Sequence, residues 1–143
     1  MATQEGAVRT FDLSLVTPDG AAFEGEAQML IVPGAAGEIG ILARHAPLVA
    51  MLKAGEIRVK SDGRWQAFAA GPGYCKVQQD RALVLVDDAV RAEDIDVEEA
   101  RREVEEARAL LERAEAGEEE IDRWQAEQRL RHAENKMAVA GRE

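Results

Sequence analysis

The sequence predicts an α+β protein in which strands and helices are segregated, an N-terminal β-sandwich or barrel followed by a C-terminal helical hairpin. Short apolar runs with period-two alternation, separated by Gly, Pro and Asp, fill the first part of the chain. Residues 92–140 contain no proline and a single glycine, Gly117, and their apolar residues recur every three or four positions. We therefore divide the chain into a strand region, residues 1–90, and a helical region, residues 91–143.

The strand region contains a series of segments with strand-like patterns. The segment FDLSLVT alternates Phe11, Leu13 and Leu15 with polar residues, as expected for a strand with one buried face. Turn residues separate the segments at intervals of about 8–12 residues, which is typical of an all-β sandwich or barrel. In chain order the predicted strands span residues 11–17, 22–32, 38–42, 48–52, 56–60, 65–70, 74–78 and 82–86.

The helical region predicts two antiparallel helices. Asp96 and, three residues later, Glu99 resemble a capping box at the start of the first helix, and Gly117 suits the position just after its end. Each helix has a narrow apolar stripe, which indicates that the two pair with each other. The stripes are Val97, Ala100, Val104, Ala107, Leu111 and Ala114, then Ala126, Leu130, Ala133, Met137 and Ala140.

Composition excludes several function classes. The 143 residues have a formal net charge of −10, which argues against nucleic acid as a partner because phosphate binding favours a basic surface. The acidic excess is concentrated in residues 91–143, with 17 acidic and 10 basic groups against 11 and 8 in residues 1–90. No targeting segment is recognisable, and no apolar run approaches the ~20 residues that span a bilayer. We expect membrane association only through another protein.

Catalytic and metal-binding patterns are absent from the sequence. The two histidines, His45 and His132, lie in different halves, and Cys75 in mid-strand is expected to be a small buried apolar residue. No serine stands in a pattern that pairs it with a base, and the Cys and His residues are too few and scattered for zinc. Asp87 and Asp88 are interpreted as a solvated turn. We therefore expect no catalytic residue, no metal and no cofactor.

Several motifs together resemble the epsilon subunits of F-type ATP synthases. The segment GEIGILARHAPLVAMLKAGEIRV (37–59) is similar to the family pattern G-E-[IL]-G-[IL]-x-P-G-H-A-P-L followed by lysine, glycine and a strand. VTPDGAAFEGEA (16–27) and GPGYCKVQQDRALVLVDDAVRAEDID (71–96) extend the resemblance, which covers the chain from about Phe11 to Ala140. It implies a ten-stranded sandwich followed by a two-helix hairpin.

The resemblance also implies a role without an active site. The sandwich would bind the gamma subunit and sit on the c-subunit ring, so that the chain couples proton flow to ATP synthesis as part of the central stalk. The hairpin would either fold against the sandwich or extend beside gamma into the alpha/beta catalytic head, where it blocks ATP hydrolysis. The implied location is the cytoplasmic side of the bacterial inner membrane, as a peripheral subunit.

The segment 37–48 is expected to contact the c ring. Glu38, Arg44 and His45 would lie at its tip, while Ile39, Ile41 and Leu42 would anchor it in the core. The chain departs from the family pattern at Ala43-Arg44, where Pro-Gly is usual. A charged turn thereby replaces a neutral one.

Some relatives bind ATP in the folded hairpin through an I-D-x-x-R-A motif and basic residues of the second helix. Here Ile95 and Asp96 match the motif, but Glu99 occupies the place of its arginine. His132 and Lys136 stand where the second helix has arginines in ATP-binding members. Because a carboxylate repels a triphosphate and Lys does not form the bidentate contact of Arg, we predict weak or absent ATP binding.

Two other functions remain open from the sequence. The chain could be a free-standing β-sandwich adaptor with a coiled-coil dimerisation tail, although Gly117 between two stripes of similar length favours pairing within the chain. A small hydrolase is the weakest alternative. Trp124 could cover the sandwich in the folded hairpin or contact gamma in the extended one.

Overall fold

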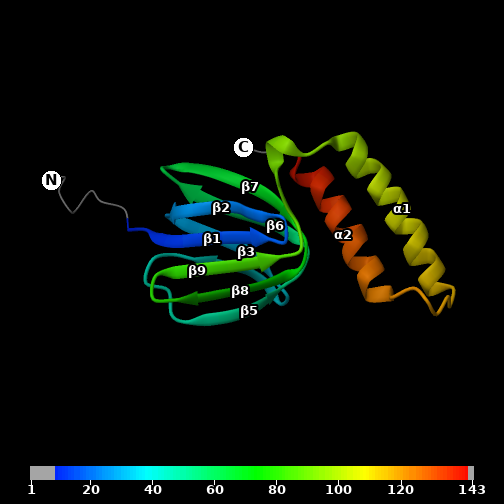
Figure 1. Cartoon of the computed structure of the whole chain (residues 1–143), viewed down its shortest axis with the longest axis horizontal. Coiled ribbons are helices and arrows are strands. Elements are labelled where there is room, and N and C mark those ends of the chain that lie inside the picture. Colours follow the sequence, from blue (N-terminus) through cyan, green and yellow to red (C-terminus); the bar gives the residue numbers. More distant parts are fainter. Residues whose placement is uncertain (1–8, 142–143) are drawn as a thin grey trace.

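A computed structural model describes residues 9–141, which form ten strands, a short 3₁₀ helix and two α-helices (Figure 1). The segregated α+β fold and the sandwich followed by two helices are confirmed. The elements are β1 (Phe11–Thr17), β2 (Gly20–Ala27), β3 (Met29–Gly34), β4 (Gly37–Ile41), β5 (Leu48–Leu52), β6 (Gly55–Ser61), β7 (Arg64–Ala70), β8 (Gly73–Gln78), β9 (Arg81–Val86), β10 (Ala89–Arg91), the 3₁₀ helix (Ala92–Asp94), α1 (Val97–Glu115) and α2 (Arg123–Val139).

The strands form one continuous sheet in the order β10-β7-β6-β3-β5-β8-β9-β1-β2, with β4 paired to β3. Neighbouring pairs are antiparallel except β1 and β9, which are parallel. The sheet curls until β2 lies against β6 and β10, which closes the sandwich around a mostly aliphatic core. The alternation in β1 predicts its buried face correctly, because Phe11, Leu13 and Leu15 all lie in this core.

The predicted strand 22–32 is wrong in one respect, because it is two strands that separate at Gln28. In β2 the glutamates Glu24 and Glu26 are exposed, as suits a strand at the end of the sheet order. In β3, by contrast, Leu30 and Val32 are fully buried between strands on both sides. A continuous apolar run and an alternating one thus belong to different positions in the sheet.

Local signals fix both ends of α1 and the start of α2. The Asp96 side chain accepts a hydrogen bond from the Glu99 amide at 3.1 Å, and Asp122 caps α2 in the same way through the Gln125 amide. Gly117 follows α1 with a φ of 97°, a conformation in which glycine is unstrained. Its amide donates to Ala114, and the next amide donates to Arg113, which is a Schellman motif.

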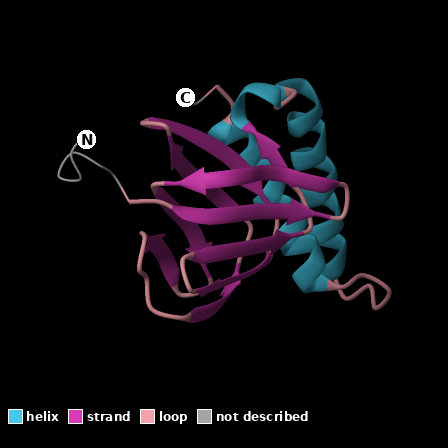
Figure 2. Ribbon diagram, turned by 60° about the vertical axis from the view of Figure 1, so that its left-hand side comes forward, coloured by secondary structure: helices cyan, strands magenta, loops and turns pink. Residues whose placement is uncertain are grey.

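The two helices pair with each other within the chain, as the stripes predict, and stand beside the sandwich (Figure 2). Only part of each stripe is buried: Ala100, Val104 and Ala107 of α1, and Ala126 and Ala133 of α2. It is α2 that rests on the sandwich, over β6 and β7. The helix-on-sheet contact is therefore separate from the helix-on-helix seam.

Arg44 adopts a left-handed backbone conformation, with a φ of 67°, at the position where the family pattern has glycine. A side chain with a Cβ is strained there by roughly 1–2 kcal/mol. We expect Arg44→Gly to raise the free energy of unfolding by about 0.5–1 kcal/mol, since the greater freedom of glycine in the unfolded chain offsets part of the relief. Urea unfolding measures this change in the free energy of unfolding. Arg44→Ala loses the same charge but keeps the Cβ, so equal stability of the two variants would contradict the explanation.

Candidate interaction surfaces

The outer face of β5, β8 and β9, here called the β5–β8–β9 face, exposes large apolar side chains. Val49 and Met51 of β5 are 72% and 68% exposed, and Tyr74 of β8 lies directly opposite Met51. Leu83 of β9 opposes Lys76 of β8 on the same side of the sheet. Adjacent exposed apolar groups of this kind mark sites of association with another protein.

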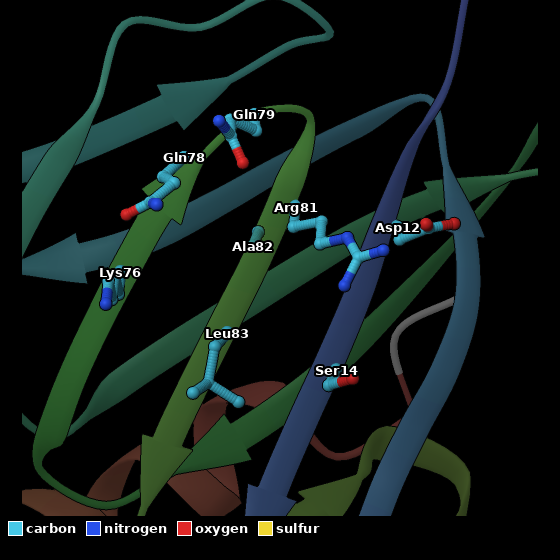
Figure 3. Close-up of a pocket in the computed structure, with 8 residues that line it drawn as sticks. All are labelled: Asp12, Ser14, Lys76, Gln78, Gln79, Arg81, Ala82 and Leu83. Atoms are coloured by element: carbon cyan, nitrogen blue, oxygen red, sulfur yellow. The ribbon is translucent and has the colours of Figure 1, made fainter.

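A polar groove adjoins this face and encloses about 680 Å³ (Figure 3). Its side chains come from β1, β8, β9 and the turn between β8 and β9, and they combine both charges with amides. The lining residues are Asp12, Ser14, Lys76, Gln78, Gln79, Arg81, Ala82 and Leu83.

The β5–β8–β9 face did not emerge from the sequence, although one signal was present. Strand β5 reads LVAML, with an apolar residue at every position, whereas a strand with one solvated face alternates. Leu52 points into the core, so Met51 beside it must point outward. An uninterrupted apolar strand at the protein surface predicts a partner on the outer side.

The predicted contact segment is divided between the two ends of β4. Glu38 lies near the start of β4, opposite Pro33. Arg44 and His45 follow its other end, where the Arg44 amide donates to the Asp80 carboxylate. Because a strand rises about 3.3 Å per residue, Glu38 does not share one tip with the other two.

The expected anchoring of this segment is correct for two of its three residues. Ile41 is buried in the core and Ile39 packs against it. Leu42 is 55% exposed, so its prediction is wrong, because it follows inward-facing Ile41 and the alternation turns it outward. Trp124 is 59% exposed at the start of α2 and does not cover the sandwich in this docked arrangement.

The two residues that match the ATP motif have structural partners. Ile95 packs against the small apolar cluster beneath α2, and Asp96 caps α1. Cys75 is buried as expected, and burial raises the pKa of its thiol to about 11. None of the helices in the described part of the chain is long and apolar enough to cross a membrane.

Asp88 joins the sandwich to α2, so its interpretation as a solvated turn is wrong. His132 Nε2 lies 2.8 Å from Asp88 Oδ2 and donates to it, because a carboxylate only accepts. Lys136 Nζ lies 3.8 Å from the same oxygen and 3.0 Å from Glu103 Oε1 of α1. The sequence separates Asp88 from His132 by 44 residues, and the folding back of the hairpin brings them together.

The two adjacent carboxylates have opposite pKa shifts. The hydrogen bond from His132 lowers the pKa of Asp88, against burial, and the charge of Lys136 adds to the effect. Burial raises the pKa of Asp87, and the negative charge of Asp88 adds to this while His132 opposes it. A lowered folded-state pKa contributes stability above the ordinary Asp value of about 3.9, and that stability is lost as pH falls through the folded-state pKa.

We therefore expect carboxyl-carbon NMR titration to give a lower midpoint for Asp88 than for Asp87. His132→Gln removes the imidazole and should raise the midpoint of Asp88. Equal midpoints for the two carboxyls in the unmodified chain would contradict the arrangement.

Comparison with known proteins agrees with both halves of this structure. Residues 10–92 match the family model described as ATP synthase, Delta/Epsilon chain, beta-sandwich domain. Residues 93–141 match the model described as ATP synthase, Delta/Epsilon chain, long alpha-helix domain. The chain belongs to the ATP synthase delta/epsilon chain family.

Relatives of the delta/epsilon family cover almost the whole chain. The ATP synthase epsilon chain of Halalkalibacterium halodurans is 41% identical over 93% of this chain and 98% of its own length. That of Shouchella clausii is 38% identical over 92% of this chain and 95% of its own. A chain from the Euglena gracilis mitochondrial ATP synthase, in a structure of OSCP, F1 and the c ring, superposes with a TM-score of 0.75 at 25% identity, covering 94% of this chain and 84% of that one. The chain is thus a non-catalytic subunit of the ATP synthase complex.

Proposed function

We propose that the chain is a central-stalk subunit that binds the gamma subunit through the β5–β8–β9 face and couples proton flow through the c ring to ATP synthesis. The observation that supports this most is the exposure of Val49, Met51 and Tyr74 on one side of a chain with a net charge of −10. An apolar centre beside a polar groove matches the composition of protein–protein interfaces. The complex would hold the chain at the cytoplasmic side of the bacterial inner membrane.

The c ring is the proposed partner of Glu38, Arg44 and His45. Since Glu38 and Arg44 lie near opposite ends of β4, cysteines placed at 38 and at 44 report on two separate regions of the sandwich. Crosslinking each to the ring in the assembled complex shows which end of β4 faces it. A complex in which neither position crosslinks would reject this part of the proposal.

The hairpin is the proposed regulatory element. It rests on the sandwich through α2, and the seam between its helices consists mostly of alanines. Burial of each alanine methyl group stabilises the seam by only about 0.8 kcal/mol. The docked and extended arrangements of such a hairpin can differ in free energy by only a few kcal/mol. In the extended arrangement it would contact the alpha/beta catalytic head and inhibit ATP hydrolysis.

The test is reconstitution of the complex with the full chain or with a chain truncated after Asp94, which retains β10. We expect both to join gamma and the c ring, and the full chain to lower ATP hydrolysis several-fold relative to the truncated one. Failure of both chains to bind gamma would reject the stalk function. Equal hydrolysis in the two complexes would reject the inhibitory role alone.

Nucleotide binding by the hairpin is expected to be weak, with a Kd for ATP above about 1 mM. Glu99 lies at the start of α1, and Asp96 already uses its carboxylate as the helix cap. Calorimetry on the full chain measures the affinity, and Glu99→Arg, which restores the family motif, should tighten it. Tight saturable binding by the unmodified chain would contradict the prediction.

A further inference from the structure

We propose that Asp88 of the sandwich is a latch, which holds the hairpin in its docked position by pairing with His132 and Lys136 of α2. This inference rests on the proposed function, in which the hairpin leaves the sandwich. The inference names Asp88 as the residue that stabilises the docked position of the hairpin. The docked position would then depend on a carboxylate within the chain and would need no bound nucleotide.

The apolar cluster that α2 shares with β7 is small. Its buried members are Ala67 and Ala69 of β7, Ala92 of the 3₁₀ helix and Val139 of α2, with Ile95 packed beside them. Three of the four buried residues are alanines, and each methyl group removes little area from water. Hydrophobic burial therefore gives α2 only a weak hold on β7, so polar contacts add to the stability of the docked position.

Two basic side chains of α2 converge on one oxygen of Asp88. His132 and Lys136 are four residues apart, so they lie on the same face of the helix. Their side chains are only 15% and 13% exposed. Polar groups with so little access to water require partners within the protein, and Asp88 Oδ2 lies 2.8 Å from His132 Nε2 and 3.8 Å from Lys136 Nζ.

His132 depends on Asp88 more than Lys136 does. Its Nδ1 atom is buried and has no hydrogen-bond partner among the described residues, so the bond from Nε2 to Asp88 is the only hydrogen bond that the ring makes with them. Lys136 also pairs with Glu103 at 3.0 Å, which links α1 to the same cluster. The cluster thus joins three elements: the β9–β10 connection, α2 and α1.

The backbone holds Asp88 in place to receive these groups. The Gly71 amide donates to the Asp88 carbonyl at 2.9 Å, and the Asp87 amide donates to the Pro72 carbonyl at 3.1 Å. Both bonds tie the β9–β10 connection to the β7–β8 connection. The carboxylate is therefore presented by the sandwich itself, and its loss should release α2 without disturbing the sheet.

Amide hydrogen exchange on the full chain tests the latch with Asp88→Asn, which keeps the shape of the side chain and removes its charge. We expect the amides of α2 to exchange about fivefold faster than in the unmodified chain. The factor reflects a charge-assisted hydrogen bond, reduced because the Asp88 side chain is 39% exposed. The amides of β1 and β9, which are not the strands over which α2 rests, should exchange at unchanged rates.

Glu134→Gln is the matched control, because Glu134 pairs with Arg108 of α1 at 3.4 Å within the hairpin. It removes one carboxylate of α2 and should leave α2 exchange unchanged. His132→Gln should accelerate exchange as Asp88→Asn does, and the double variant should exchange no faster than either single variant.

The latch is overturned if Asp88→Asn leaves α2 exchange unchanged, if Glu134→Gln has the same effect, or if β1 and β9 accelerate equally. Because exchange is measured on the isolated chain, these outcomes do not depend on gamma binding or on hydrolysis. A latch confirmed by exchange, in a chain that fails to join the complex, would leave the inference standing and reject the proposed function.

Discussion

Gly73→Ala is expected to lower the free energy of unfolding by about 3 kcal/mol, the largest effect on stability anticipated for a single methyl group in this chain. Gly73 lies in β8 between Leu52 of β5 and Val86 of β9. A Cβ at this position would stand 1.9 Å from the Leu85 carbonyl oxygen and 2.7 Å from the Val86 Cα. Both are backbone atoms, so relief requires the strands to move apart.

Gly40→Ala is the matched control for this prediction. Gly40 also lies inside a strand, but the atom nearest to its added Cβ is the end of the flexible Met29 side chain, at 3.4 Å. We expect its stability to stay within about 1 kcal/mol of the unmodified chain. Urea unfolding of the two variants decides, and equal midpoints would show that β8 and β9 do not approach as closely as described.

Met51→Glu is expected to weaken binding of the gamma subunit at least about 30-fold. The Met51 side chain is 68% exposed and lies across from Tyr74, so the change leaves the core intact. Covered by a partner, the new carboxylate would lose its contact with water beside the apolar groups Val49 and Tyr74, which costs about 2 kcal/mol or more. A difference of 1.4 kcal/mol corresponds to a tenfold change in affinity.

Ala21→Glu places the same charge on an exposed position of β2, a strand that lies at one end of the sheet order and is not part of the β5–β8–β9 face. It should bind gamma as the unmodified chain does. Titration calorimetry or surface binding with purified gamma compares the two, and unfolding curves confirm that both are folded. If Met51→Glu binds gamma normally, the β5–β8–β9 face is not the gamma-binding surface.

Local signals in the sequence were sufficient for most of the fold. The alternation of β1, the cap Asp96 and the turn residue Gly117 were each predicted correctly, because strand burial and helix ends depend on residues within a few positions of each other. The prediction of one strand over residues 22–32 was wrong because the two halves of this run have different neighbouring strands in the sheet. Nearby residues in the sequence do not indicate which strands will be neighbours.

The candidate surfaces were less accessible from the sequence. Glu38, Arg44 and His45 read as one loop, yet they lie near both ends of β4 because the segment between them is itself a strand. Asp88 read as an ordinary turn residue, and nothing near it in the sequence indicates its partners. Met51 was visible in principle, since every residue of LVAML is apolar.

The sequence by itself determined the division into a β-sandwich and a helical hairpin, the helix caps and the absence of a recognisable catalytic pattern. Periodicity and capping are short-range properties, so they can be read along the chain. Only the tertiary structure decided that α2 rather than α1 rests on the sandwich and that Asp88 receives His132 and Lys136. Such contacts join residues more than forty positions apart, and their geometry follows from how the sheet curls and where the hairpin folds back.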